Sequence, residues 1–315
     1  MNFHDVFLFL DEHRLKGLAT VLVTVCAVEG SSMRNPGSVM GVAADGSFAG
    51  SLSGGCIENA VVSEALDVLK SGDARVVRFG AGSPYLDIKL PCGGGLDLHF
   101  QPLGESDLAA QCLASIERRS AYSIALSETG AEHRSDWHPP SFDPESATGV
   151  FGHWPAPKFE IVGHGAGVEA LCDLAQTLGC ETRVLTPDER LAASLDRRMM
   201  DVARLKRTSQ TDLIQSDPWT AFVFLFHDHD WEIELMTRAF ELPHFYIGAM
   251  GGRKAHANRR RALRMRGITE EQLFTMKAPI GVFHSSRDPQ TLALSTLAEV
   301  IRTYQETDFE AVLGA

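Results

Sequence analysis

Two cysteines lie in segments whose backbone carries almost no bulky side chains. Cys56 ends the run that begins Gly50-Ser-Leu-Ser-Gly-Gly and precedes Ile57 and Glu58, and Cys92 is followed by three glycines. Glycine-rich segments let main-chain N–H groups approach a ligand closely, and a thiol among them stays accessible instead of packing as a small hydrophobe. These two segments therefore indicate a ligand with soft-metal or sulfur chemistry.

The other four cysteines are expected to be packing residues, because free cysteine is among the most buried residue types. They are Cys26, Cys112, Cys172 and Cys180. No pair of cysteines has the C-x-x-C spacing of a redox or zinc motif,.

The bulk composition favours a globular protein of two domains. The chain has 315 residues, and its formal net charge of -12 would repel a polyanion,. We expect no nucleic acid partner. The first residues do not resemble a cleaved signal, and no apolar run reaches the length of a membrane span,. The sequence is thus expected to belong to a cytoplasmic protein.

In the N-terminal part, short strands surround one helix. The strand patterns cover 20–28, 38–43, 47–52 and the residues that follow Cys92,. Apolar residues three or four apart predict a helix that begins near Ile57 and stops at Gly72, which would place Cys56 at its N-terminus,. This part is expected to be a small α+β domain.

The C-terminal part alternates strands and helices. Strands are expected at 159–162, 181–186, 221–226 and 245–248, and helices at 168–178, 231–241, 253–266 and from Pro289 to about Gln305,. Such alternation predicts an α/β domain with a Rossmann-like parallel sheet. The domains are expected at 1–103 and 158–305, with a proline-rich connecting region and linker at 104–157 and a tail at 306–315,.

Three segments of the C-terminal part end a strand with residues that suit a ligand. The turn Gly163-His-Gly165-Ala-Gly167 suits a phosphate, although Val168 and Thr186 stand where a dinucleotide fold has its third glycine and its ribose-binding acid, and Asp188 comes two residues late,. An NAD(P) site and a scaffold that binds another ligand both remain open.

The second segment is His227-Asp-His-Asp230, which follows the strand at 221–226 directly. It could hold a divalent metal, line the ligand cleft or cap the next helix,.

The third segment, Gly248-Ala-Met-Gly-Gly252, leads into Arg253 and Lys254, which with the helix N-terminus suit an anion,. Most of the later arginines of that helix are interpreted as a solvated face. Near the N-terminus, Ser31 and Ser32 follow a strand and could be nucleophiles or polar contacts to a ligand.

Taken together, scattered motifs across both parts resemble the XdhC/CoxI family, the accessory proteins of xanthine dehydrogenase and related molybdenum hydroxylases. The motifs are Gly30-Ser-Ser32, Pro36-Gly37, the segment 50–58, Cys92-Gly-Gly94, the turn 163–167, His227-Asp-His229, Tyr246-Ile-Gly248, Gly252-Arg253 and Ala278-Pro279-Ile-Gly281.

This resemblance implies a chaperone that binds the molybdenum cofactor, supports its sulfuration with a cysteine desulfurase and delivers it to a molybdenum hydroxylase. It also implies a homodimer, and the cofactor is molybdopterin or a dinucleotide form of it. Cys56 and Cys92 are expected near the molybdenum. The residues expected to bind the cofactor are Ser31, Ser32, Ser53, Gly54, Gly55, Cys56, Glu58, Cys92, Gly93, Gly94, Gly163, Gly165, Gly167, His227, Asp228, His229, Gly248 and Arg253. The alternative is an NAD(P)-dependent oxidoreductase that acts on a small carbonyl substrate.

Overall fold

The computed structural model describes residues 3–30, 34–83, 93–226, 231–283 and 288–313, and the chain divides after Pro155 into two units. The first unit contains a five-stranded antiparallel sheet in the order β3-β2-β1-β5-β4. Its strands are β1 (Thr20–Glu29), β2 (Val39–Ala43), β3 (Phe48–Ala49), β4 (Arg75–Gly80) and β5 (Gly95–Pro102).

One face of this sheet is covered by helix α2 (Glu58–Ser71), whose apolar side packs on the valines and leucines of β1 and β5. Leu52 and Ile57, which flank the loop that carries Cys56, are fully buried in the same core. The helix ends at Gly72, which has a left-handed φ of 81°,. The predicted start and end of this helix are confirmed.

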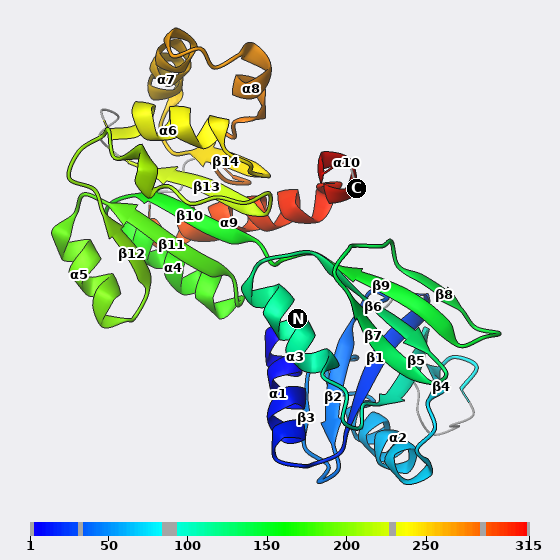
Figure 1. Ribbon diagram of the computed structural model, residues 1–315. Helices are drawn as coiled ribbons and strands as arrows, with labels where there is room; N and C mark the ends of the chain where they lie inside the picture. Colours follow the sequence, from blue (N-terminus) through cyan, green and yellow to red (C-terminus); the bar gives the residue numbers. More distant parts are fainter. Residues whose placement is uncertain (1–2, 31–33, 84–92, 227–230, 284–287, 314–315) are drawn as a thin grey trace. The chain divides into compact units, whose positions relative to one another are not determined.

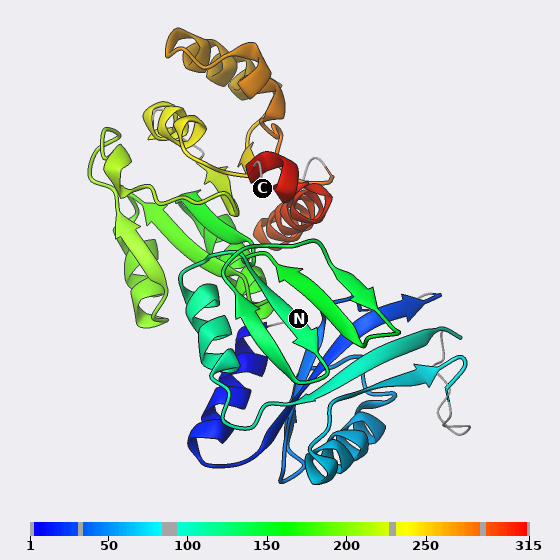
Figure 2. The same cartoon turned by 45° about the vertical axis from the view of Figure 1, so that its right-hand side comes forward.

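The opposite face is covered by α1 (Phe3–Leu15), α3 (Leu108–Glu117) and a second antiparallel sheet in the order β7-β6-β9-β8. The strands of this sheet are β6 (Tyr122–Ser127), β7 (Gly130–Arg134), β8 (Ser141–Asp143) and β9 (Thr148–His153). Figure 2 shows the four-stranded sheet lying across the five-stranded one, with α1 and α3 side by side.

The segment expected to be a connecting region and linker, 104–157, is therefore mostly folded and belongs to the first unit. Its strands are short, and the prolines that suggested a linker stand between strands or after the last one, where they interrupt no ladder,. Tyr122, Ile124 and Phe151 fill the core of the unit. The expected tail also carries a short helix, α10 (Phe309–Leu313), with Phe309 buried.

The second unit is a parallel sheet in the order β12-β11-β10-β13-β14, with helices on both faces. Its strands are β10 (Lys158–Gly163), β11 (Glu181–Thr186), β12 (Asp201–Arg204), β13 (Thr220–Leu225) and β14 (Tyr246–Ala249). The strand order reverses between β10 and β13, and in open α/β sheets a ligand binds outside the carboxyl ends of the strands at such a point.

Helices α4 (Ala166–Thr177), α5 (Glu189–Arg197) and α9 (Pro289–Glu306) pack on one face of this sheet. The other face is covered by the 3-10 turn η1 (Thr211–Leu213) and by α6 (Glu232–Glu241), α7 (Arg253–Met265) and α8 (Glu270–Thr275). The predicted α/β class and Rossmann-like sheet are confirmed. Among the helices of the described residues, none is both long and apolar enough to cross a bilayer.

Candidate functional sites

In the first unit, Glu58 organises the loop that carries Cys56. The residue lies in the first turn of α2 and is only 6% exposed. Its carboxylate accepts six hydrogen bonds of 2.7–3.2 Å, from the hydroxyls of Ser51 and Ser53 and the backbone N–H groups of Leu52, Ser53, Gly55 and Ile57.

These hydrogen bonds keep the carboxylate charged. Burial by itself would raise the pKa of Glu58, but the hydrogen bonds from Ser53 and Ser51 outweigh it and lower that pKa to about 2,. Since both oxygens are already engaged by the loop, Glu58 acts here as the group that fixes the backbone around the thiol.

Cys56 itself is exposed. Its N–H donates to Oγ of Ser53 at 2.9 Å, and Gly54 and Gly55 precede it with left-handed φ angles of 78° and 110°. A Cβ added at Gly55 would meet nothing within 4 Å, so the backbone beside the thiol is open. The loop thus combines a fixed backbone with an accessible sulfur.

Three of the four cysteines expected to be packing residues are buried. Burial raises the thiol pKa of Cys26 and Cys172 to about 12, and it raises that of Cys112 further still. Cys180 is partly buried. These thiols are therefore poor nucleophiles at neutral pH.

The second glycine segment lies where β1 and β4 end and β5 begins. The carbonyl of Gly94 accepts the N–H of Ala81 at 2.9 Å, and a Cβ added at Gly30 would lie 3.3 Å from Cα of Gly94. Gly93 has a left-handed φ of 70°, and a Cβ added there would meet nothing within 4 Å. Ser31, Ser32 and Cys92 adjoin these residues in sequence but lie outside the described residues.

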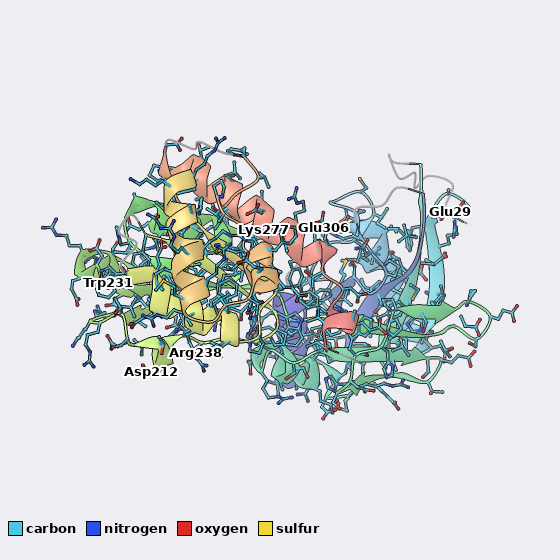
Figure 3. The ribbon with its side chains drawn as sticks, turned by 90° about the horizontal axis from the view of Figure 1, so that it is seen from above. Glu29, Asp212, Trp231, Arg238, Lys277 and Glu306 are labelled. Atoms are coloured by element: carbon cyan, nitrogen blue, oxygen red, sulfur yellow. The ribbon has the colours of Figure 1, made fainter. Side chains whose placement is uncertain are left out.

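An ionic cluster missed by the sequence analysis borders this strand end. The guanidinium of Arg78 donates to both oxygens of Asp97 at 3.1 Å and pairs with Glu29, which Figure 3 labels at the end of β1. Its Nε donates to the carbonyl of Ala81 at 2.6 Å. A Cβ at Gly95 would lie 2.7 Å from the same guanidinium, so this glycine makes room for Arg78. The signal in the sequence is the cross-strand pair Arg78 and Asp97, but finding it requires the register of β4 on β5.

In the second unit, the turns that follow β10 and β14 meet the end of β13. The N–H of His164 donates to the carbonyl of Leu225 at 3.3 Å, and the N–H of Met250 donates to that of Phe224 at 3.0 Å. The ring of His164 lies edge-on to Phe226, with centroids 5.5 Å apart. His164 is thus part of this edge although the sequence analysis did not select it. His227, Asp228 and His229 follow Phe226 in sequence and lie outside the described residues.

The glycines of these turns serve different purposes. A Cβ at Gly163 would lie 2.5 Å from the carbonyl oxygen of Leu225, and one at Gly248 would lie 2.5 Å from the hydroxyl of Tyr246. Both residues therefore allow close packing. At Gly165, which precedes α4 with a φ of 86°, a Cβ would meet nothing within 4 Å, whereas Gly167 sits against α9.

A third segment, 277–281, runs along the outer side of β14. Lys277 pairs with the backbone of Ile247 and Ala249, and Figure 3 labels it. Oε2 of Glu299 on α9 accepts both the hydroxyl of Tyr246, at 2.6 Å, and the N–H of Gly281, at 2.8 Å. The motif Ala278-Pro279-Ile-Gly281 is thereby fixed beside the same sheet.

The N-terminus of α7 carries cations where helices usually carry acids. Gly252 offers no side-chain cap, the first turn contains no acidic residue, and Arg253 and Lys254 are exposed there. Cations at this end oppose the helix dipole, so the arrangement suits an anion that would offset both.

The features that would favour a dinucleotide are weak. Val168, at the position of the usual third glycine, is fully buried, and Thr186 is 1% exposed. The carboxylate of Asp188 accepts the N–H groups of Arg190 and Leu191 and so caps α5. It is committed to the helix rather than presented to a ribose.

The arginine-rich helix α7 is not solvated throughout. Arg260 and Arg264 are exposed or partly exposed and pair with Glu270, as expected of a solvated face. Arg259 is the exception: it is 2% exposed, because its guanidinium turns into a buried ionic cluster. Within the part of the chain that the structure describes, no three His, Cys, Asp or Glu side chains gather as a metal site.

Comparison with known proteins leads to the same family as the sequence motifs. Residues 13–80 match the model of the XdhC and CoxI family, and residues 160–300 match that of the XdhC Rossmann domain. The chain is 31% identical over 309 residues to the molybdenum cofactor insertion chaperone PaoD of Escherichia coli (strain K12), covering 95% of this chain and 89% of PaoD. It is 25% identical to a probable xanthine dehydrogenase subunit of Bacillus subtilis (strain 168), covering 96% and 97% of the two chains.

The fold also matches a crystal structure from Bacillus halodurans, which is described as a xanthine dehydrogenase. The TM-score is 0.79 at 19% identity, with 98% of both chains covered. The two regions that match the family models lie one in each unit, and the similarity to PaoD runs along nearly the whole chain. The chain therefore belongs to the XdhC and CoxI family.

Proposed function

We propose that this protein is a chaperone of the molybdenum cofactor, which it binds as cargo, helps to sulfurate and delivers to a molybdenum hydroxylase of the xanthine dehydrogenase type. The names of two relatives, a molybdenum cofactor insertion chaperone and a probable xanthine dehydrogenase subunit, support this role. In the proposal a cysteine desulfurase supplies the sulfur, and the protein works as a homodimer in the cytoplasm.

The observation that carries the proposal is the exposed thiol of Cys56 on a loop fixed by Glu58. Thiolates are the ligands that soft metals prefer, and an accessible thiol can also lie beside a sulfido ligand. A Cβ added at Gly55 would meet nothing within 4 Å, so the chain beside the thiol leaves room for a planar pterin to approach the sulfur,. In the proposal Cys92, Gly93 and Gly94 also contact the cofactor, with Ser31 and Ser32 as polar contacts.

In the proposal the second unit contacts the anionic group of the cargo. Molybdopterin carries a phosphate, and its dinucleotide form carries a longer anionic extension. The start of α7, with Arg253 and Lys254, suits such a group,. Gly165 gives open backbone at the neighbouring turn. His227, Asp228 and His229 are proposed as further contacts at this edge.

Cofactor content tests the proposal. The protein would be purified from a host that makes the cofactor, and molybdenum would be measured by elemental analysis and pterin by fluorescence after oxidation. We expect both in a constant ratio, below one cofactor per chain because the cargo exchanges. A preparation without either, from a host whose molybdenum hydroxylases are loaded, would overturn the proposal.

An NAD(P)-dependent oxidoreductase is the second candidate, because the strand order of the second unit and its glycine turn are those of dinucleotide-binding sheets,. Titration with NADH and NADPH on the same preparation distinguishes the two candidates. Tight binding with turnover of a small carbonyl compound would favour the oxidoreductase, and we expect neither.

A further inference from the structure

Arg259 lies at the centre of a buried ionic cluster beside the carboxyl ends of β13 and β14. Its Nε lies 2.8 Å and its Nη2 lies 2.7 Å from the same oxygen, Oε2 of Glu232. Arg259 is 2% exposed and Glu232 is 0% exposed. A charge pair this deeply buried needs well-placed partners, because both charges have lost their water.

Two further hydrogen bonds complete the surroundings of the guanidinium. Nη2 donates to the carbonyl of Met250 at 2.9 Å, and Nη1 lies 2.6 Å from Nδ1 of His256. A guanidinium only donates hydrogen bonds, so Nδ1 of His256 must accept, and the imidazole carries its proton on Nε2. The cluster therefore fixes the tautomer of His256 as well as its orientation.

The three partners of Arg259 belong to three separate segments at this edge. Glu232 begins α6, directly after the connection from β13, and His256 lies in the first turns of α7. Met250 lies in the loop between β14 and α7, and its N–H is bonded to Phe224 at the end of β13. One side chain thus ties the starts of α6 and α7 to the loop that follows β14.

We infer that Arg259 and Glu232 are positioning residues, which hold the N-terminal turn of α7 in the orientation that binds the anionic end of the cargo. This inference rests on the proposed function, in which a phosphate lies at that turn. The pair acts through the backbone of the helix start and does not itself contact the ligand. Its role would explain why a charged pair is buried at the ligand edge, where an apolar pair would serve stability equally well.

The same sheet contains a matched control. Glu160 and Arg183 face each other on β10 and β11, are 0% and 6% exposed, and are joined by a 2.6 Å bond from Nη1 to Oε1. Arg183 also donates to the carbonyl of Leu213 at 2.7 Å. Both residues lie in the first halves of their strands, away from the carboxyl edge. This pair is also buried and hydrogen-bonded, but it supports none of the segments at the proposed anion site.

The experiment compares two double variants of the full chain, Glu232→Met with Arg259→Met and Glu160→Met with Arg183→Met. Replacing both members of a buried pair with apolar residues removes the charges together and avoids leaving one unpaired. Thermal unfolding reports stability. Anaerobic equilibrium binding of molybdenum cofactor, released from a donor hydroxylase, reports affinity, with inorganic phosphate as competitor.

We expect the Glu232 and Arg259 double variant to bind the cofactor about tenfold more weakly than the wild type, with binding no longer weakened by phosphate. The control double variant should keep its affinity within about twofold. Equal affinity in both double variants, at comparable melting temperatures, would overturn the inference. If the wild type itself binds no cofactor, the proposed function fails instead.

A single variant covers the case in which the double variant does not fold. Arg259→Lys keeps the charge beside Glu232. A single ammonium, however, cannot replace the three guanidinium nitrogens that contact Glu232, His256 and the carbonyl of Met250 at the same time. We expect it to fold and to bind the cofactor several-fold more weakly. Wild-type affinity in a folded Arg259→Lys protein would likewise overturn the inference.

Discussion

The hydroxyl of Ser53 donates a 2.7 Å hydrogen bond to Oε2 of Glu58 and accepts the backbone N–H of Cys56 at 2.9 Å. One carboxylate thus fixes, through one hydroxyl, the backbone that presents the thiol. Because Glu58 belongs to α2 and α2 packs on β1 and β5, the position of the thiol is set by the core of the first unit.

Replacement of Glu58 by Gln should loosen this loop. An amide NH₂ would face N–H donors that now meet a carboxylate oxygen, and a mismatched buried donor costs about 2–3 kcal/mol. Urea denaturation should report that loss. Glu64→Gln is the matched control on the same helix, because Glu64 pairs with the partly exposed Arg75 and should cost about 1 kcal/mol or less,. Equal losses in the two variants would contradict the role assigned to Glu58.

The stability contributed by Glu58 should depend on pH in a defined direction. Its pKa falls from an ordinary value of 4.5 to about 2 on folding. A lowered pKa in the folded state means that the contribution is complete above the ordinary pKa and is lost as the pH falls toward about 2. Urea midpoints measured from neutral pH down to about pH 3 should therefore fall more steeply for the wild type than for Glu58→Gln. Parallel curves would show that the carboxylate gains nothing from its hydrogen bonds.

Two glycines of the turn after β10 should respond to alanine with opposite signs. In Gly163→Ala the new Cβ would lie 2.5 Å from the carbonyl oxygen of Leu225, and relief of this overlap should cost about 1–3 kcal/mol,. In Gly167→Ala it would lie 3.5 Å from Cδ2 of Leu292, an ordinary contact, and alanine favours the helix by about 0.5–1 kcal/mol,. Differential scanning calorimetry checks both signs. A stabilised Gly163→Ala protein would refute the close approach of β10 and β13.

Asp188 should matter for stability and not for nucleotide binding. Asp188→Ala removes the cap of α5 and should cost about 1 kcal/mol, whereas Asp188→Asn should retain most of the cap,. Cofactor content should be unchanged in both. If either change abolished a measurable affinity for NADH, Asp188 would be a ribose ligand and the oxidoreductase candidate would gain support.

Most strands and helices of the second unit were predictable because they carry a local signal, whereas α5, β12 and α8 were not predicted. The glycine turn, the apolar strand 221–226 and the helix N-cap Asp288 are all read from neighbouring residues, and the structure confirms them. The sheet formed by β6 to β9 was not predicted, because its short strands are bounded by prolines and polar turns, and its burial depends on packing against α1 and α3.

For the candidate sites, the sequence indicated which segments matter but not the contacts that fix them. The glycines around Cys56 follow from composition, but the hydrogen bonds from the N–H groups of Leu52, Ser53 and Gly55 to Glu58 depend on the folded path of the loop. In α7, Arg259 is one of several arginines in a polar helix, and only the packing of α6 against α7 distinguishes it from its exposed neighbours. Charge pattern alone therefore could not identify it.

Delivery of the cofactor by a Cys56→Ser variant tests the central claim most directly. The side chain is exposed, so the substitution should change stability by no more than about 0.5 kcal/mol,. Cys180→Ala, at a partly buried thiol, is the control. The measurement is the activity of an apo molybdenum hydroxylase after incubation with each cofactor-loaded protein. We expect activation by the wild type and by Cys180→Ala, and little activation by Cys56→Ser. Full activation by a correctly folded Cys56→Ser protein would contradict the account.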